Sequence, residues 1–132
     1  DKIQSSILKD LWMGSNIAEM PAVSILNKLN AKYKIWIISN TLENHIEKLK
    51  TNFSFLNHID GIITSEKAGV HKPNPEIYNF ALNNSNSSAF NSLFIDDSLS
   101  NIETADNMGF FTHHYLNYEN FIIKMKNQFN LI

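Results

Sequence analysis

The sequence predicts an α/β fold: a Rossmann-like parallel sheet with helices on both of its faces. Two observations carry this prediction. Short apolar runs typical of buried strands recur along the chain, at 35–38, 61–64, 92–96 and 110–113. Between and after them lie segments whose apolar residues recur at helical spacing, so strand alternates with helix four times. That alternation is typical of the βαβ units of a parallel sheet.

The N-terminal part of the chain is predicted to be helical. Apolar residues at helical spacing predict a helix over 3–13, which the Gly14-Ser15-Asn16 sequence ends. A second helix is expected over 21–31, with Pro21 in its first turn. Both helices precede the first predicted strand, so they are set apart from the alternating part of the chain.

The middle of the chain contains two predicted strands and a stiff loop. The strand at 35–38 runs into Ser39 and Asn40, and a helix follows. After the short strand at 61–64 comes a loop over 65–75 that holds a glycine and two prolines. Asn74 and Pro75 are expected to begin the next helix, as its cap and its first residue.

Two adjacent carboxylates lie at the carboxyl end of the strand at 92–96. Asp96 and Asp97 come just before a helix over 100–108, whose start is indicated by the capping-box spacing of Ser100 and Glu103. In open α/β sheets, ligands bind at the carboxyl ends of the strands. A hard cation such as Mg²⁺ would offset the repulsion between the two carboxylates. The alternative is structural: Asp97 caps the helix and Asp96 is solvated.

Composition excludes several classes of function. The 132 residues carry a net charge of −2, which favours neither a nucleic-acid nor a membrane partner. With no cysteine there is no disulfide framework and no thiol chemistry, and a cytoplasmic location is expected. All 11 basic residues are lysine, so an anion must be held by ammonium groups, hydroxyls and backbone N–H groups.

Three segments are expected to meet at one edge of the sheet, because the carboxyl ends of parallel strands lie together. Ser39 follows the first predicted strand, Lys72 lies in the proline-stiffened loop, and Asp96 and Asp97 follow the strand at 92–96. A hydroxyl, an ammonium and the N–H groups of a helix start suit a phosphate.

This ordered set resembles the haloacid dehalogenase-like (HAD) hydrolase superfamily, in its phosphatase-like branch with a small helical cap. Ile37-Ile38-Ser39-Asn40 resembles the second motif, the segment Lys72–Tyr78 the third, and Phe94–Ser98 the fourth. The resemblance implies that Ser39, Asn40 and Lys72 bind the phosphoryl group, that Lys72 and Ser39 assist catalysis, and that Asp97 and Asp96 bind Mg²⁺. It further implies that a small phosphorylated metabolite is hydrolysed through an aspartyl-phosphate.

The chain departs from the family at its first motif, a strand that ends in Asp-x-Asp and supplies the nucleophile. No such motif is found in this sequence. We therefore expect a partial chain that is inactive alone, with 1–20 as a remnant of the helical cap and 21–132 as a partial core. The sheet is expected to lack its central first strand, which a missing N-terminal segment or a second chain would complete.

Two alternatives remain open at this point. The chain can be a non-catalytic relative that binds a phosphorylated ligand or a partner protein. It can also be a 2-haloacid dehalogenase, a metal-independent activity that the Asp96-Asp97 pair argues against.

Overall fold

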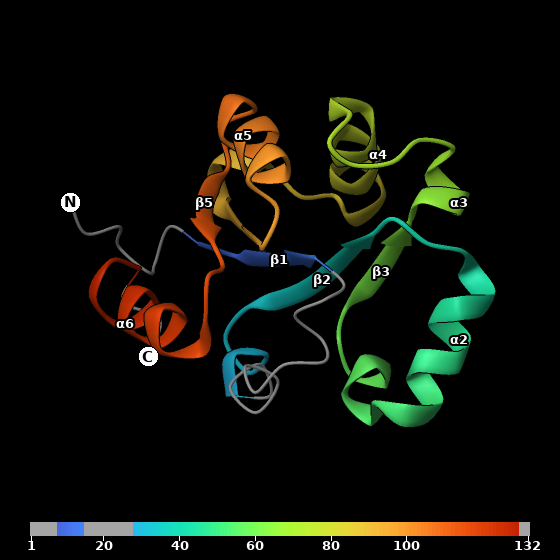
Figure 1. Cartoon of the computed structure of the whole chain (residues 1–132), viewed down its shortest axis with the longest axis horizontal. Coiled ribbons are helices and arrows are strands. Elements are labelled where there is room, and N and C mark those ends of the chain that lie inside the picture. The colour runs from blue at the N-terminus through green and yellow to red at the C-terminus, as the bar shows by residue number, and fades with distance from the viewer. Residues whose placement is uncertain (1–7, 15–27, 130–132) are drawn as a thin grey trace.

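The computed structural model describes residues 8–14 and 28–129 and contains one five-stranded sheet (Figure 1). All the pairings are parallel, and the strand order is β3-β2-β1-β4-β5. The strands are β1 (Asp10–Gly14), β2 (Lys34–Ser39), β3 (Gly61–Thr64), β4 (Ser92–Asp96) and β5 (Phe111–His114). The predicted α/β class with a parallel sheet is confirmed.

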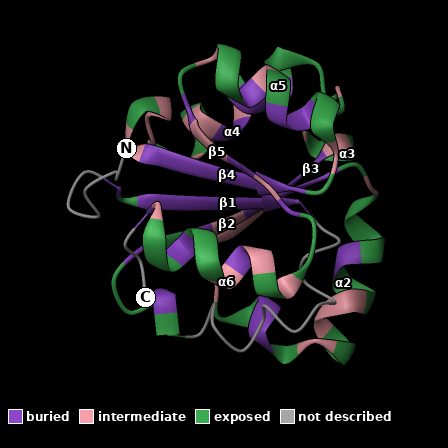
Figure 2. Cartoon of the chain, turned by 60° about the vertical axis from the view of Figure 1, so that its left-hand side comes forward, coloured by how far each residue is buried: buried purple, intermediate pink, exposed green. Residues whose placement is uncertain are grey.

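Helices cover both faces of the sheet, as Figure 2 shows: α3, α4 and α5 lie on one side, and α2 and α6 on the other. Among the described residues, the α-helices are α2 (Glu43–Asn52), α3 (Ser65–Ala68), α4 (Pro75–Ser85), α5 (Leu99–Asn107) and α6 (Tyr118–Asn127), and the 3₁₀ turns are η2 (Ser54–Asn57) and η3 (Ala89–Asn91). This arrangement buries the sheet on both faces, which explains why its strands read as continuous apolar runs.

The prediction that the sheet lacks its central strand is wrong. β1 lies at the centre, with β2 on one side and β4 on the other. The helix expected over 3–13 is wrong at residues 10–13, which belong to the extended segment Asp10–Gly14. All five residues of β1 are buried. The hydrogen bonds of β1 to both neighbouring strands, and its burial on both faces of the sheet, outweigh the local helical preference that the apolar spacing indicated. The sheet is therefore continuous without a strand from another segment or a second chain.

The strands divide their side chains between two cores. On one face, Leu11 and Met13 of β1 pack in the cluster that includes Phe121 and Met125 of α6. On the other face, Trp12 packs in the cluster formed with α4 and α5, which includes Tyr78, Phe94 and Ile102. The alternation along β1 follows the two-residue period of a strand.

Other elements agree with the sequence-based predictions, with small changes at their ends. The Asn74 cap is confirmed, because its side chain accepts a hydrogen bond from the backbone N–H of Glu76, and Pro75 is the first helical residue. The capping box at Ser100 is wrong: α5 begins one residue earlier, and its N-cap, Ser98, makes no side-chain capping bond. The loop after β3 contains a short helix, α3.

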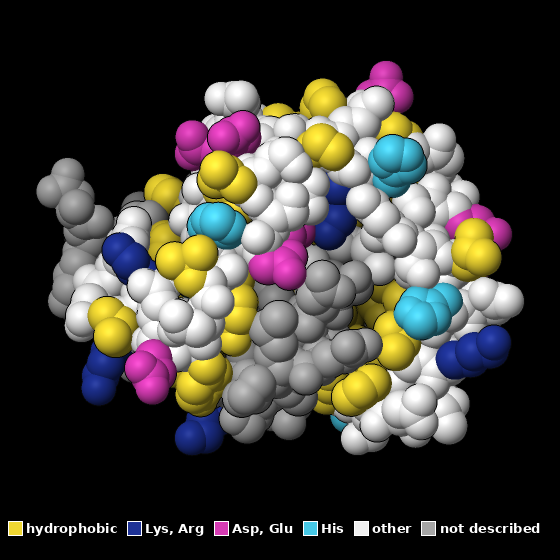
Figure 3. Space-filling model, in the orientation of Figure 1, with side chains coloured by type: hydrophobic (Ala, Val, Ile, Leu, Met, Phe, Trp, Pro, Cys, Tyr) yellow, Lys and Arg dark blue, Asp and Glu magenta, His cyan; other side chains and the backbone are white. Residues whose placement is uncertain are grey.

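Part of the predicted organisation lies outside the described residues. This holds for most of the proposed cap remnant over 1–20 and for most of the helix over 21–31, of which Lys28 and Leu29 are described as helical. Within residues 8–14 and 28–129, no helix has the length and apolar character that crossing a bilayer requires. On the face drawn in Figure 3, acidic and basic side chains are scattered among other residues, without gathering into one broad patch of a single sign over the part described.

Candidate active site

A polar cavity of about 410 Å³ opens at the carboxyl edge of the sheet. Its walls come from the ends of β1 and β4, from the residues after β2, from the loop before α4, and from the start of α5. The lining residues are Gly14, Asn40, Lys72, Pro73, Asp96, Asp97, Ser98, Ser100 and Asn101. The structure thus brings together four of the five site residues that the sequence predicted.

Lys72 and Asp96 form a buried ion pair in this cavity. The Nζ of Lys72 lies 3.0 Å from Oδ2 of Asp96. Lys72 is 6% exposed and Asp96 is 2% exposed. Two further donors contact the same carboxylate: the backbone N–H of Ser98 on Oδ1 at 2.9 Å, and Nδ2 of Asn101 on Oδ2 at 3.2 Å. These two donors satisfy the carboxylate half of the pair, which offsets part of the cost of burying its charge.

The surroundings keep Asp96 ionised. Burial by itself raises the pKa of its carboxyl group. The positive charge of Lys72 and the hydrogen bonds from Ser98 and Lys72 outweigh burial, so the pKa of Asp96 lies below its ordinary value. The alternative in which Asp96 is solvated is therefore excluded by its burial.

Asn40 holds the backbone of the Lys72 loop. Its Oδ1 accepts from the backbone N–H of Lys72 at 2.8 Å, and its Nδ2 donates to the carbonyl oxygen of Lys72 at 3.1 Å. The hydroxyl of Thr104 donates to the carbonyl oxygen of Pro73 at 2.8 Å, which ties the same loop to α5. The ammonium is therefore presented by a backbone that is fixed from two sides.

Ser39 is the predicted site residue that does not line the cavity. It ends β2, is 2% exposed, and lies beside Thr64 in the parallel register. The following residue, Asn40, reaches the cavity instead.

Gly14 takes up the end of the central strand. A Cβ at this position would lie 2.6 Å from Oδ2 and 2.9 Å from Cγ of Asp96, far closer than real side chains approach. The absence of a side chain is therefore what allows Asp96 to turn toward Lys72 across the end of β1. From Leu11 to Ala18 the sequence contains no carboxylate, so the described end of this strand brings none to the cavity.

The donors present do not by themselves make a magnesium site. Within the described ranges, no three acidic, histidine or cysteine side chains converge on one point. Asp96 already accepts three hydrogen bonds, one of them from an ammonium. Of the two adjacent carboxylates, Asp97 is the one exposed to solvent. Mg²⁺ prefers six oxygens in near-octahedral geometry. The predicted Mg²⁺ site at Asp96 and Asp97 thus stays a prediction, and no chemical step is derived from it.

Sequence reasoning missed three contributors to the site. Asn101 lies five residues after Asp96, on the first turn of α5, and a helix starting at Leu99 would have placed it facing back toward the carboxylate. The N–H of Ser98 belongs to the turn between β4 and α5. Gly14 was interpreted as the end of a helix over 3–13, so its place at the end of the central strand was missed.

Comparison with known proteins adds a family match. The family model described as haloacid dehalogenase-like hydrolase matches residues 9–114, which include β1 to β5. A search of curated proteins found no match.

Solved structures of similar fold were also found. An uncharacterised protein from Corynebacterium glutamicum has a TM-score of 0.73 and 18% identity, over 95% of this chain and 97% of that one. A HAD family enzyme from Bacteroides thetaiotaomicron, an aspartate-to-alanine mutant in complex with magnesium and inorganic phosphate, has a TM-score of 0.71 and 17% identity, over 86% and 98%.

A further similar structure is an L-2-haloacid dehalogenase from Xanthobacter autotrophicus with chloropropionic acid covalently bound. Its TM-score is 0.66 and its identity 21%, over 80% of this chain and 44% of that one. At such identities these similarities show the fold alone.

Proposed function

Because the chain belongs to the haloacid dehalogenase-like hydrolase family, we propose that it binds a small phosphorylated metabolite in the cavity at the carboxyl edge of its sheet. We propose further that the described residues alone do not turn such a ligand over. The observation that carries the proposal is the buried ammonium of Lys72, which faces this cavity beside a strand end without a side chain.

The ammonium supports anion binding because it has more hydrogen-bonding capacity than the protein uses. It carries three N–H donors, and its contact among the described residues is the one with Asp96. The start of α5 adds the hydroxyls of Ser98 and Ser100, which line the same cavity. The positive end of the helix dipole favours negative charge at this place. The oxygens of a phosphoryl group would thus accept hydrogen bonds from donors that line the cavity.

Phosphoryl transfer through an aspartyl-phosphate needs a carboxylate nucleophile opposite the lysine. The end of the central strand is the place from which such a group would reach the cavity, and Gly14 takes up that place. Lys72 is paired with Asp96 instead of with a nucleophile. Asp96 itself is a poor nucleophile, since its two oxygens accept three hydrogen bonds.

A magnesium-dependent phosphohydrolase is the second candidate. It is favoured by the two adjacent carboxylates at this edge and by the fold shared with a Bacteroides HAD family enzyme in complex with magnesium and inorganic phosphate. Mg²⁺ would supply charge neutralisation at the phosphoryl oxygens, with Asp97 and Asp96 as its protein ligands. The part of the chain described here would contribute Lys72 and Asn40, which hold the phosphoryl group in place, while the nucleophile would have to come from residues outside it.

The experiment is a pair of measurements on the full chain. Binding of inorganic phosphate is followed by calorimetry, and release of phosphate from p-nitrophenyl phosphate is followed with MgCl₂ and with a chelator. We expect binding that Lys72→Met weakens by about tenfold or more, which is typical of losing a charged hydrogen bond. The control Lys48→Met removes an exposed lysine of α2 and should leave binding unchanged.

The outcomes separate the candidates. Binding without turnover supports the first proposal. Turnover that requires Mg²⁺ and is lost in Lys72→Met supports the phosphohydrolase, with a nucleophile from outside the described residues. Chloride release from 2-chloropropionate in the presence of the chelator would instead restore the dehalogenase. The absence of phosphate binding would refute the proposed function.

A further inference from the structure

A second and larger cavity lies at the opposite edge of the sheet, where the strands begin. Its volume is about 720 Å³. The central strand connects the two cavities: β1 runs from Asp10 in this cavity to Gly14 in the other, a span of about 13 Å at the usual strand rise. The lining residues are Leu8, Lys9, Asp10, Asn30, Ala31, Lys32, Tyr33, Lys34, Asp60, Asn86, Ser87, Ser88, Phe90 and Asn91. None of these residues belongs to the candidate active site.

Positive charge prevails in this amino-edge cavity. Three lysines line it against two aspartates. Both carboxylates are already engaged by the protein: Oδ1 of Asp10 accepts from Nε1 of Trp36 at 2.9 Å, and Oδ2 of Asp60 accepts from the backbone N–H of Ile35 at 2.7 Å.

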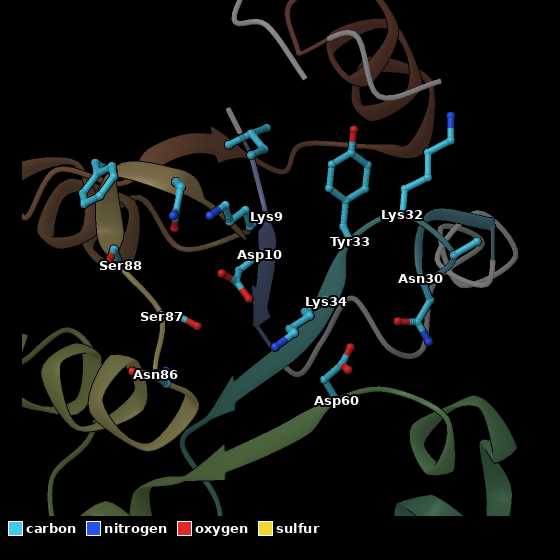
Figure 4. Close-up of a pocket in the computed structure, with 14 residues that line it drawn as sticks. Lys9, Asp10, Asn30, Lys32, Tyr33, Lys34, Asp60, Asn86, Ser87 and Ser88 are labelled. Carbon is cyan, nitrogen blue, oxygen red and sulfur yellow. The ribbon is translucent and has the colours of Figure 1, made fainter. Parts of the chain in front are cut away.

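The lysines, in contrast, are uncommitted. Lys9 and Lys34 are exposed and form no ion pair with another described residue. Figure 4 shows Lys9 just before β1, Asp10 at the start of β1 and Lys34 at the start of β2, facing Ser87 and Ser88 across the cavity, while Lys32 points away from them. Two free ammonium groups on neighbouring strands, with hydroxyls opposite, suit a phosphate.

Two other features of the cavity indicate which groups a ligand would carry besides a phosphate. Asn91 lines this cavity, and its Oδ1 is buried and has no hydrogen-bond partner among the described residues, so it can accept from a donor such as a hydroxyl. Phe90, in η3, is 70% exposed and lies on the wall of the cavity. An exposed aromatic ring beside cationic groups is a platform on which a planar base can stack.

We propose that the amino-edge cavity binds a mononucleotide. Its phosphate lies between Lys9 and Lys34, its ribose hydroxyls reach Asn91, and its base stacks on Phe90. This site goes beyond the proposed function, because its residues and its edge of the sheet are separate from those that bind the phosphorylated metabolite.

Trp36 offers a direct readout. Its indole donates to Asp10 on the wall of the cavity and stacks on Trp12 with ring centroids 5.3 Å apart. A ligand that reorients Asp10 changes the environment of the indole, so tryptophan emission reports occupancy. The full chain is titrated with AMP, and in parallel with ribose 5-phosphate.

Two variants test the two halves of the site. The double variant Lys9→Gln/Lys34→Gln is expected to weaken AMP binding by about tenfold or more. The matched pair Lys48→Gln/Lys126→Gln removes the same charge from exposed helix positions and should change it less than twofold. Phe90→Ala is expected to weaken AMP by about fivefold while leaving ribose 5-phosphate unchanged.

Lys72→Met distinguishes this cavity from the active site, with circular dichroism confirming that the variant is folded. AMP binding that survives Lys72→Met and is lost in the amino-edge double variant supports the proposal. Binding that is lost in Lys72→Met and unaffected by the double variant overturns it, because AMP then occupies the other edge. Equal affinity for AMP and ribose 5-phosphate overturns the assignment of a base to Phe90, and no AMP binding at millimolar concentration overturns the site.

Discussion

Replacing Lys72 by methionine tests the central feature of the carboxyl edge, its buried ion pair. The change keeps a long apolar side chain but removes the ammonium 3.0 Å from Asp96. The direct attraction at that distance is about 5 kcal/mol at the effective dielectric constant of about 20 that suits protein sites. Ser98 and Asn101 still donate to the carboxylate, so part of this loss is compensated.

We expect Lys72→Met to lower the free energy of unfolding by about 3 kcal/mol at pH 7, the lower end of what breaking one half of a buried pair costs. Urea denaturation followed by circular dichroism measures this value. The destabilisation of the variant should become smaller at lower pH. Without the lysine, burial favours the neutral form of Asp96, so the carboxyl group takes up a proton on folding as the pH falls, and the penalty shrinks.

In the wild-type protein the dependence has the opposite sign. The lowered pKa of Asp96 contributes stability above the pKa of the unfolded state, and that stability is lost as the pH falls through the folded-state pKa.

The double variant Lys72→Met/Asp96→Asn is the control, because it removes both charges and leaves no unpaired carboxylate. It should recover more than half of the loss. A cost below about 1 kcal/mol for Lys72→Met, or strictly additive effects in the double variant, would refute the idea that the two groups form a buried pair.

Three further predictions concern other parts of the chain. Gly14→Ala should lower the free energy of unfolding by roughly 1–3 kcal/mol in urea titrations, because the added Cβ would overlap Asp96, and an unchanged midpoint would contradict that close approach. Burial lowers the pKa of His113 to about 4 from its ordinary 6.5, so the unfolded state binds more protons and stability should fall by up to about 3 kcal/mol between pH 6.5 and 4. His113→Gln should remove that slope in thermal melts, while His45→Gln on the exposed side of α2 should keep it. Asn74→Ala should cost about 1 kcal/mol through loss of the α4 cap, and a calorimetric melt within error of wild type would count against it.

Much of the fold could be predicted because its information is local. The runs at 35–38, 61–64 and 92–96 are apolar, short and rich in branched residues, and each forms the expected strand. The Asn74-Pro75 start of α4 was also readable, since capping depends on neighbours in the chain. The placement of Asn40, Lys72 and Asp96 at one edge followed from a general property of parallel sheets.

The central strand could not be read in this way. Leu11 and Trp12 are equally consistent with a helix stripe and with a strand, because five residues are too few to separate the two periods. What decided the outcome was the pairing of β1 with β2 on one side and β4 on the other. That pairing joins segments more than twenty residues apart along the chain, and it overrides a local preference worth only tenths of a kcal/mol per residue.

The sequence by itself determined the class of fold, the family resemblance and the edge at which the site lies, because these depend on residue type and order along the chain. Only the tertiary structure decided that Gly14 brings bare backbone against Asp96, that Lys72 pairs with this carboxylate across 24 residues of chain, and that a lysine-lined cavity exists at the far edge. The physical reason is distance along the chain. Contacts of this kind form only after the strands have assembled, and no periodicity within one segment encodes which distant side chain fills the space beside it.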